Sequence, residues 1–196
     1  MKKIFLVVIP LLMLALLWVI FFWPVEKEYQ VLDSQPQKRS SEFNLISSKG
    51  EVSLNDFKGK VVLIYFGYTW CPDVCPTNLS MMSGALSQLE ADEVDQVQGL
   101  FISIDPERDN VKRLEEYTQF FHPKIQGLTG SKQQIDELAK RYGVSFRRVK
   151  QQESATDYVV DHSSMTYVIG KDGKLVGNLP HAALPEQILL MVREHL

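Results

Sequence analysis

The chain has 196 residues, of which 45% are hydrophobic and 23% are charged, and these values are ordinary for a globular protein. Its net charge is −3, and no cluster of basic residues interleaved with aromatic ones is present, so nucleic-acid binding is not expected. The part of the chain that follows a short N-terminal segment has the size of one domain.

The N-terminal segment predicts a membrane anchor. Lys2 and Lys3 precede the uncharged stretch 4–23, which as a helix would span roughly 30 Å, the thickness of a hydrocarbon core. No small-residue cleavage site follows it, so an uncleaved anchor is favoured over a signal peptide. The two lysines stay in the cytoplasm, and no Arg- and Ser-rich presequence is present. We therefore expect a single-pass protein of the bacterial inner membrane with its domain in the periplasm or cell envelope.

Polar residues between the anchor and the first apolar pattern indicate a tether over 24–41, so the folded domain is expected over 42–196. Its first half predicts a hairpin, a strand, a helix and a further strand. In chain order these are a hairpin over Phe43–Leu54 turning at Ser48-Lys49-Gly50, a buried strand over Lys60–Tyr65, a helix over Pro76–Leu89 and a buried strand over Leu100–Ile104.

The second half continues the alternation. The expected elements are a helix over Val111–Phe121, a helix over 132–142 with a capping box at its start and Gly143 at its end, strands over Tyr158–Val160 and Met165–Ile169, a turn over 171–174 into a strand over Leu175–Leu179, and a helix opened by Pro185. Alternating strands and helices predict a three-layer α/β domain.

The only two cysteines, Cys71 and Cys75, lie between the first buried strand and its helix. This is the thioredoxin-like placement, where a helix N-terminus lowers thiol pKa. Three intervening residues put the two thiols one helical turn apart, so both sulfurs can bind one ion while a disulfide stays feasible. Two cysteines are too few for an iron–sulfur cluster or a structural zinc site, whereas copper accepts two or three ligands. A purely structural disulfide is the alternative, but so short a loop adds little stability.

A third ligand would have to come from a distant segment. The chain has four histidines, His122, His162, His181 and His195. His195 is next to the C-terminus, while His122 and His181 lie in expected turns or loops. His162 lies between two apolar segments, where a lone histidine is more often an ordinary loop residue than a ligand. The residues alone leave the third ligand open.

Three motifs together resemble those of the Sco/SenC family. They are Cys71-Pro72-Asp73-Val74-Cys75-Pro76 following Gly67-Tyr68-Thr69, then Ser103-Ile104-Asp105-Pro106-Glu107-Arg108-Asp109, and Tyr158-x-Val160-Asp161-His162-Ser163. The resemblance includes the N-terminal anchor and runs to the C-terminus. One departure is Trp70, where many relatives carry histidine.

The resemblance implies a thioredoxin-like fold that binds Cu(I) or Cu(II) through Cys71, Cys75 and His162. It implies a role in maturing the binuclear copper centre of cytochrome c oxidase, by delivering copper or by keeping the recipient cysteines reduced. The implied partners are the copper-centre subunit of the oxidase, a copper donor and a thiol reductant. Without metal, Cys71 and Cys75 are expected to form a disulfide. Such a protein is a metallochaperone and not an enzyme in the turnover sense.

An envelope thiol–disulfide oxidoreductase is the alternative, since it needs both cysteines but not His162. A peroxidase ranks last, because no residue pattern singles out an activated cysteine.

Acidic residues near these motifs have minor predicted roles. The stretch from Asp105 to Asp109 is interpreted as closing a strand and capping the next helix, with its acidic residues near the helix N-terminus. Asp73 is expected to orient a ligand or to stabilise a helix start, and Asp161 to orient His162. The methionines Met81, Met82 and Met165 are interpreted as core residues rather than soft ligands.

Overall fold

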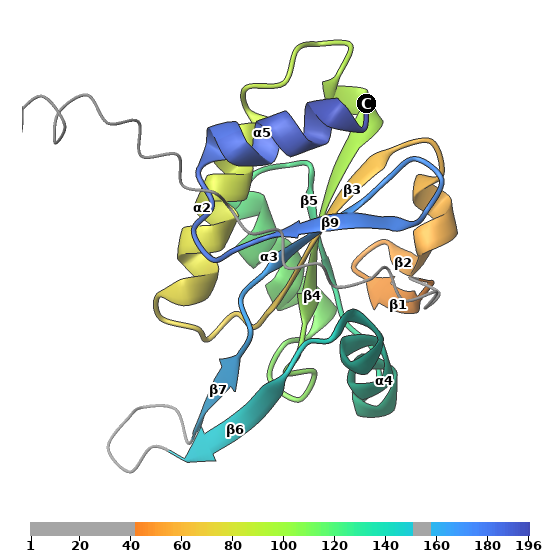
Figure 1. Ribbon diagram of the computed structural model, residues 1–196. Coiled ribbons are helices and arrows are strands. Elements are labelled where there is room, and N and C mark those ends of the chain that lie inside the picture. Colours follow the sequence, from red (N-terminus) through yellow and green to blue (C-terminus); the bar gives the residue numbers. More distant parts are fainter. Residues whose placement is uncertain (1–41, 151–157) are drawn as a thin grey trace, which may run out of the picture. The chain divides into compact units, whose positions relative to one another are not determined.

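A five-stranded mixed sheet forms the centre of the fold in the computed structural model, which describes residues 42–150 and 158–196 (Figure 1). Its neighbouring strands are, in spatial order, β5 (Ile125–Leu128), β4 (Val97–Ser103), β3 (Val61–Gly67), β8 (Thr166–Ile169) and β9 (Leu175–Leu179). Strands β3, β4 and β5 run parallel, and β8 and β9 are antiparallel to their neighbours. Every residue of β3 is buried, which confirms the central strand predicted from its continuous apolar run.

Helices cover both faces of this sheet. One face carries α2 (Val74–Leu86), α3 (Val111–Phe121) and α5 (Pro185–Glu194), whose side chains reach the strand glycines 99, 127 and 177. On the opposite face, α4 (Lys132–Tyr142) places its last residue against the rings of Phe66 and Tyr167. The predicted three-layer α/β architecture is therefore confirmed.

A hairpin of β1 (Asn44–Ser47) and β2 (Gly50–Ser53) precedes the sheet, as predicted. It is followed by the short 3-10 helix η1 (Leu54–Phe57). A second 3-10 helix, η2 (Val94–Gln96), leads into β4. The hairpin bonds to the end of β5, where Ile46 and Thr129 exchange two backbone hydrogen bonds.

Capping residues explain why the helix predictions succeeded where they did. Helix α4 begins after Ser131, which forms the predicted capping box with Gln134, and it ends at Gly143 with φ +72°. Helices α3 and α5 also begin where predicted. Helix α2 instead begins at Val74, before the expected Pro76, and ends at Leu86, before the expected Leu89. It ends there because the N–H groups of residues 88 and 89 bond to carbonyls three residues back, which turns the chain out of the helix.

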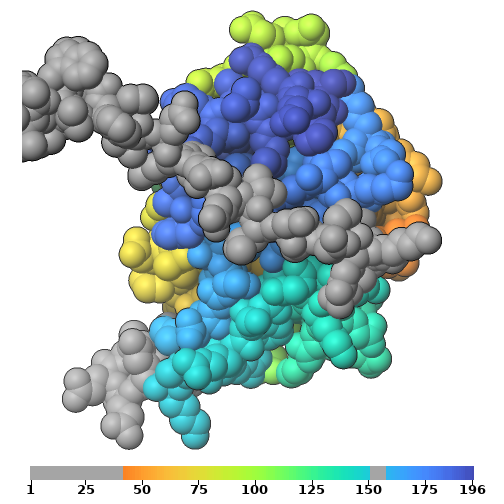
Figure 2. Space-filling view, viewed as in Figure 1, coloured from red at the N-terminus to blue at the C-terminus, as the bar shows by residue number. Residues whose placement is uncertain are grey.

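A separate two-stranded antiparallel sheet was only half predicted. Strand β6 (Phe146–Lys150) was missed because four of its five residues are exposed, so it lacks the apolar alternation of a half-buried strand. It pairs with β7 (Tyr158–His162), which runs two residues further than expected and ends on His162. Figure 1 shows this β6–β7 hairpin extending away from the five-stranded sheet, and in Figure 2 β6 lies at the lower edge of the view.

The predicted anchor (1–23) and tether (24–41) lie outside the described residues. Within the ranges that the structure describes, no helix combines the length and apolar character needed to cross a membrane.

Candidate metal centre

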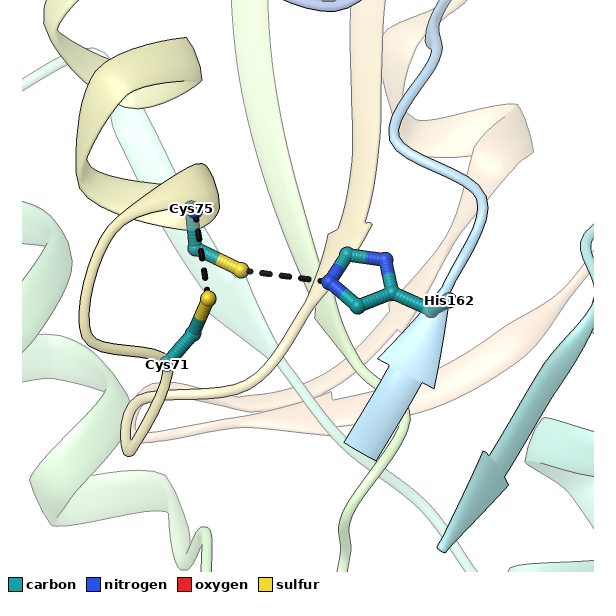
Figure 3. A group of neighbouring side chains, drawn as sticks. All are labelled: Cys71, Cys75 and His162. Atoms are coloured by element: carbon teal, nitrogen blue, oxygen red, sulfur yellow. Dashed lines mark hydrogen bonds between the residues drawn. The ribbon is translucent and has the colours of Figure 1, made fainter. Parts of the chain in front are cut away.

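The two cysteines meet at the junction of β3 and α2. Cys71 lies in the loop after β3, and Cys75 lies in the first turn of α2. Both are buried and both are free thiols. The backbone N–H of Cys75 donates to the Cys71 Sγ at 3.4 Å (Figure 3). The i, i+4 spacing therefore brings the two side chains to one side of the helix start.

His162 reaches the same place from β7. Its Nε2 lies 3.5 Å from the Cys75 Sγ, although the two residues are 87 positions apart in the chain (Figure 3). Its Nδ1 lies 2.9 Å from the backbone carbonyl of Ser163. A carbonyl only accepts, so Nδ1 carries a proton, and Nε2 is the nitrogen that faces the Cys75 sulfur. A proton held on Nδ1 in this way leaves Nε2 as the nitrogen that can bind a metal.

The distances fit a small soft ion. One ligand atom from each of Cys71, Cys75 and His162 lies within 4.8 Å of the other two. With bonds of about 2.0–2.3 Å, as zinc makes to nitrogen and sulfur, three ligands around one ion lie about 3.5–4 Å apart. Thus only a small closure would bring all three onto one ion. Two thiolates and an imidazole are donors suited to copper or zinc.

The two thiols differ in acidity. A hydrogen bond from the Cys75 thiol lowers the pKa of Cys71 to about 4. His162 and backbone N–H groups at the helix start also lower this pKa, whereas burial raises it. Burial raises the pKa of Cys75, and the hydrogen bond that it gives to Cys71 adds to this effect. The pair therefore holds one thiolate, on Cys71, and one proton, on Cys75.

Aromatic rings and a glycine shape the space around the sulfurs. The ring centroids of Tyr65 and Tyr68 lie 6.3 and 6.0 Å from that of His162, in edge arrangements. A Cβ on Gly67 would lie 2.7 Å from the Cys75 Sγ, so only glycine leaves room for the sulfur there. Beside the site opens a groove of about 420 Å³, with Val74 and Val159 in its walls. The three side chains are therefore enclosed by aromatic rings on the core side and can be reached from the surface through the groove.

Asp109 holds the loop that carries Cys71. Its buried carboxylate accepts hydrogen bonds from the Thr69 N–H (2.9 Å), the Thr69 hydroxyl (2.6 Å) and the Ser103 hydroxyl (2.8 Å). The prediction that Asp109 caps a helix was wrong. The cap of α3 is Asn110, whose side chain accepts from the Arg113 N–H.

Asp105 holds the β6–β7 hairpin. This residue is 0% exposed, and its carboxylate accepts from the Tyr158 hydroxyl (2.8 Å), from Arg148 (3.3 Å) and from Arg108. Arg108 also donates to the Tyr158 carbonyl at 2.9 Å, and its guanidinium stacks on the Tyr158 ring. The predicted capping role of Asp105 was therefore wrong as well, because its partners fix β7 and, through β7, His162.

The predicted roles of Asp161 and Asp73 have different outcomes. Asp161 pairs with Arg147 at 3.1 Å rather than orienting His162. Asp73 lies at the N-cap of α2, the helix-start position that was one of its two expected roles, although its side chain makes no cap hydrogen bond and its carbonyl accepts from Thr77.

Neither the remaining histidines nor the three methionines join the cluster. His122 accepts from the Lys124 N–H, His195 caps the end of α5, and His181 contacts Asn78. Met82 is fully buried, and Met81 and Met165 pack against the core, as predicted.

Trp70 stands beside the site and is 42% exposed. The Arg113 guanidinium lies 4.3 Å from its ring centroid, in a cation–π contact. The same arginine donates to the Thr69 hydroxyl. Trp70 is therefore held by the network that fixes the cysteine loop.

The fold and the site define a thioredoxin-like domain with a Cys–Cys–His cluster. A family model described as SCO1/SenC matches residues 32–196. A mitochondrial SCO2 homolog of Bos taurus is 41% identical over 157 residues, which are 79% of this chain and 59% of the bovine protein. An SCO2-like protein of Rickettsia conorii is 39% identical over 157 residues, covering 80% of this chain and 76% of that protein. The chain belongs to the SCO1/SenC family, and it spans less than two thirds of the bovine relative.

Solved structures agree with this assignment. Arabidopsis thaliana ScoI with copper bound superposes with a TM-score of 0.73 at 34% identity, covering 80% of this chain and 97% of that one. Yeast Sco1 with copper bound gives a TM-score of 0.70 at 34% identity, covering 79% of this chain and 86% of that one. BsSco is described as a Sco-family cytochrome c oxidase assembly protein with a disulfide switch. It gives a TM-score of 0.61 at 28% identity, covering 80% of this chain and 92% of that one.

We predict that Asp105→Ala loosens the β6–β7 hairpin and costs about 3 kcal/mol of unfolding free energy, because it leaves the arginines around it without their buried partner. Urea unfolding gives the free energy. Hydrogen exchange at the Val160 amide, which donates to the Tyr68 hydroxyl, reports on the hairpin. The matched control is Asp161→Ala, which breaks an exposed ion pair on the same hairpin and should cost less than about 1 kcal/mol. Equal costs for both variants would contradict the assignment.

A second prediction concerns the pH dependence of alkylation. Since the pKa of Cys71 is lowered to about 4, its thiolate persists below the ordinary thiol range and is lost only as the pH falls through that value. Iodoacetamide should therefore label Cys71 at nearly the same rate at pH 7.5 and 5.5, and before Cys75. Peptide mass spectrometry after timed quenching measures both rates. A Cys71 rate that falls about tenfold per pH unit across this window would show an ordinary thiol instead.

Proposed function

We propose that this protein binds one copper ion through Cys71, Cys75 and His162 and assists the maturation of the binuclear copper centre of cytochrome c oxidase. The observation that carries the proposal is the convergence of two sulfurs and one imidazole nitrogen within 4.8 Å. Two relatives with this fold are copper-bound in their solved structures, and BsSco is described as belonging to a family of oxidase assembly proteins.

The ligand set suits an ion that is passed on. Two thiolates favour Cu(I), and an imidazole helps to hold Cu(II). The ion is thus the cargo of the protein, bound through donors that tolerate both oxidation states. The recipient is the copper-centre subunit of the oxidase, and a separate donor supplies the copper.

The same two cysteines support a reducing role toward the recipient. In that exchange the Cys71 thiolate attacks a disulfide of the recipient, and Cys75 gives up its proton and resolves the mixed disulfide, which leaves Cys71 and Cys75 as a disulfide. The recipient gains two electrons, the proton of Cys75 and a second proton from water, and becomes a dithiol. A separate thiol reductant then restores Cys71 and Cys75. The lowered pKa of Cys71 and the proton on Cys75 favour this direction of attack.

This second activity is also the alternative function, an envelope thiol–disulfide oxidoreductase acting on protein cysteines. It requires the cysteines but not the imidazole. Retention of copper by the reduced protein after desalting favours the first function. Disulfide reductase activity without copper retention favours the second.

We further propose that residues 1–23 anchor the protein in the bacterial inner membrane, that 24–41 form a tether, and that 42–196 form the copper-binding domain in the periplasm. The support is the charge and apolar pattern of the first 41 residues. An anchor keeps the copper site within reach of a membrane-embedded recipient, because roughly 18 flexible residues extend a little over 20 Å on average.

Loss of single ligands tests the copper site. The reduced protein should retain about one Cu(I) per chain, and Cys71→Ala or Cys75→Ala should retain less than about a tenth of that amount, because one thiolate and one imidazole make a poor Cu(I) site. His162→Ala should weaken Cu(II) more than Cu(I), since both thiolates remain. His122→Ala is the matched control, a histidine bonded elsewhere. Copper is measured by mass spectrometry after desalting, and full loading of Cys75→Ala would refute the site.

Release from the membrane tests the anchor. A periplasmic version that begins at Glu42 should fold and bind copper like the full chain, because no proposed ligand precedes this residue. At equal expression it should support less oxidase assembly, since the anchor raises the effective concentration near the recipient. Oxidase activity in membranes and copper content of the purified domain are the two measurements. Full assembly activity without the anchor would show that tethering is dispensable.

A further inference from the structure

A buried amide lies behind the metal centre. Asn78 sits on the inner face of α2 and is 3% exposed. Its Oδ1 accepts from the Ala182 N–H at 3.1 Å. Its Nδ2 donates to the Tyr65 hydroxyl and to the Val74 carbonyl, both at 3.1 Å, and lies 2.7 Å from the His181 Nδ1. The amide thus connects β3 with the loop between β9 and α5.

The Ala182 backbone fixes which way the amide points. An N–H group only donates, so the atom that faces it is the amide oxygen, and the amide nitrogen must then face Tyr65. Ala182 has φ +53°, the only positive φ of a non-glycine residue among those described. A residue with a side chain adopts this conformation at some cost, and the surrounding structure must hold it there.

The direction of this bond decides what Tyr65 does with its own proton. Because the Tyr65 oxygen accepts from Asn78, its O–H is left to donate elsewhere. The acceptor within reach is the Cys75 Sγ, at 3.8 Å. Tyr65 is 0% exposed, so water does not compete for the proton.

We propose that Asn78 is a positioning residue that directs the Tyr65 hydroxyl onto the Cys75 sulfur and so sets how strongly this sulfur donates to copper. The proposal rests on the proposed function, in which Cys75 binds the ion as a thiolate. A hydrogen bond to a thiolate is charge-assisted and withdraws electron density from sulfur. Partners of this kind tune both the orientation and the donor strength of a metal ligand.

A purely structural role predicts something different. If Asn78 only ties α2 to the loop of Ala182, its replacement destabilises the fold but leaves the electronic state of the copper–sulfur bond unchanged. If Asn78 acts through Tyr65, its replacement changes the copper–sulfur bond only while the Tyr65 hydroxyl is present. A double-mutant cycle separates the two roles.

The experiment uses the copper-loaded full chain with Tyr65→Phe, Asn78→Asp and the double variant. Asn78→Asp keeps the shape but replaces the donor by an acceptor, so the Tyr65 hydroxyl turns to it and away from Cys75. The thiolate-to-Cu(II) charge-transfer absorption should move to lower energy in both single variants, because an unbonded thiolate is the stronger donor. The double variant should show no shift beyond that of Tyr65→Phe.

Matched controls are available in the same domain. Tyr117→Phe removes another buried hydroxyl, one for which the described part of the chain offers no hydrogen-bond partner. Asn55→Asp makes the same amide-to-carboxylate change at an exposed position away from the site. Neither control should move the absorption. The proposal would be overturned if the absorption shifts of the single variants are no larger than those of the controls, or if the two single-variant shifts add up in the double variant.

A metal-free measurement keeps the test independent of copper binding. In the reduced, copper-free protein, the side-chain N–H signals of Asn78 should exchange slowly with solvent and should move on Tyr65→Phe but not on Tyr117→Phe. Absence of copper from the wild-type protein would refute the proposed function while this measurement still reports the hydrogen-bond chain. Asn78 signals that exchange fast with solvent, or that do not move on Tyr65→Phe, would refute the hydrogen bond from Asn78 to Tyr65 itself.

Discussion

Two buried carboxylates hold the metal centre together. Asp109 binds the loop before Cys71 through Thr69, and Asp105 binds the strand that ends on His162 through Tyr158. Both aspartates follow the end of β4 and are fully buried. The sheet therefore supplies one fixed point from which both halves of the site are positioned.

The differing acidity of the two thiols follows from the same arrangement. Cys71 receives hydrogen bonds from its partner thiol and from backbone N–H groups at the start of α2, while Cys75 is enclosed by β3 and the helix. A space left by Gly67 brings the Cys75 sulfur against the sheet, close to Tyr65. The packing of β3 on α2 thus decides which sulfur is present as the thiolate and which one retains its proton.

Much of this could be predicted from the sequence, and the failures have physical reasons. Helix caps at Ser131 and Gly143 and the apolar run of β3 are local signals, so these elements were predicted correctly. The roles of Asp105 and Asp109 depend on partners up to 53 residues away in the chain, and an acidic residue after a strand looks locally like a helix cap. For His162, the local sequence favoured an ordinary loop residue, and only the resemblance to a family indicated a metal ligand. Asn78 was missed because a polar residue in an amphipathic helix is normally exposed.

The β6–β7 hairpin is attached to the rest of the domain in a way that bears on the imidazole ligand. Among the described residues, no backbone-to-backbone hydrogen bond joins it to the five-stranded sheet, and its backbone is held by side chains, through the Tyr68 hydroxyl on the Val160 N–H and Arg108 on the Tyr158 carbonyl. The position of the His162 imidazole therefore depends on the side chains of Asp105, Arg108 and Tyr68 and not on a strand ladder. The sulfurs, by contrast, are set in the core. The three ligands are thus held in two different ways, and a change at Asp105 would displace the imidazole while leaving the two sulfurs in place.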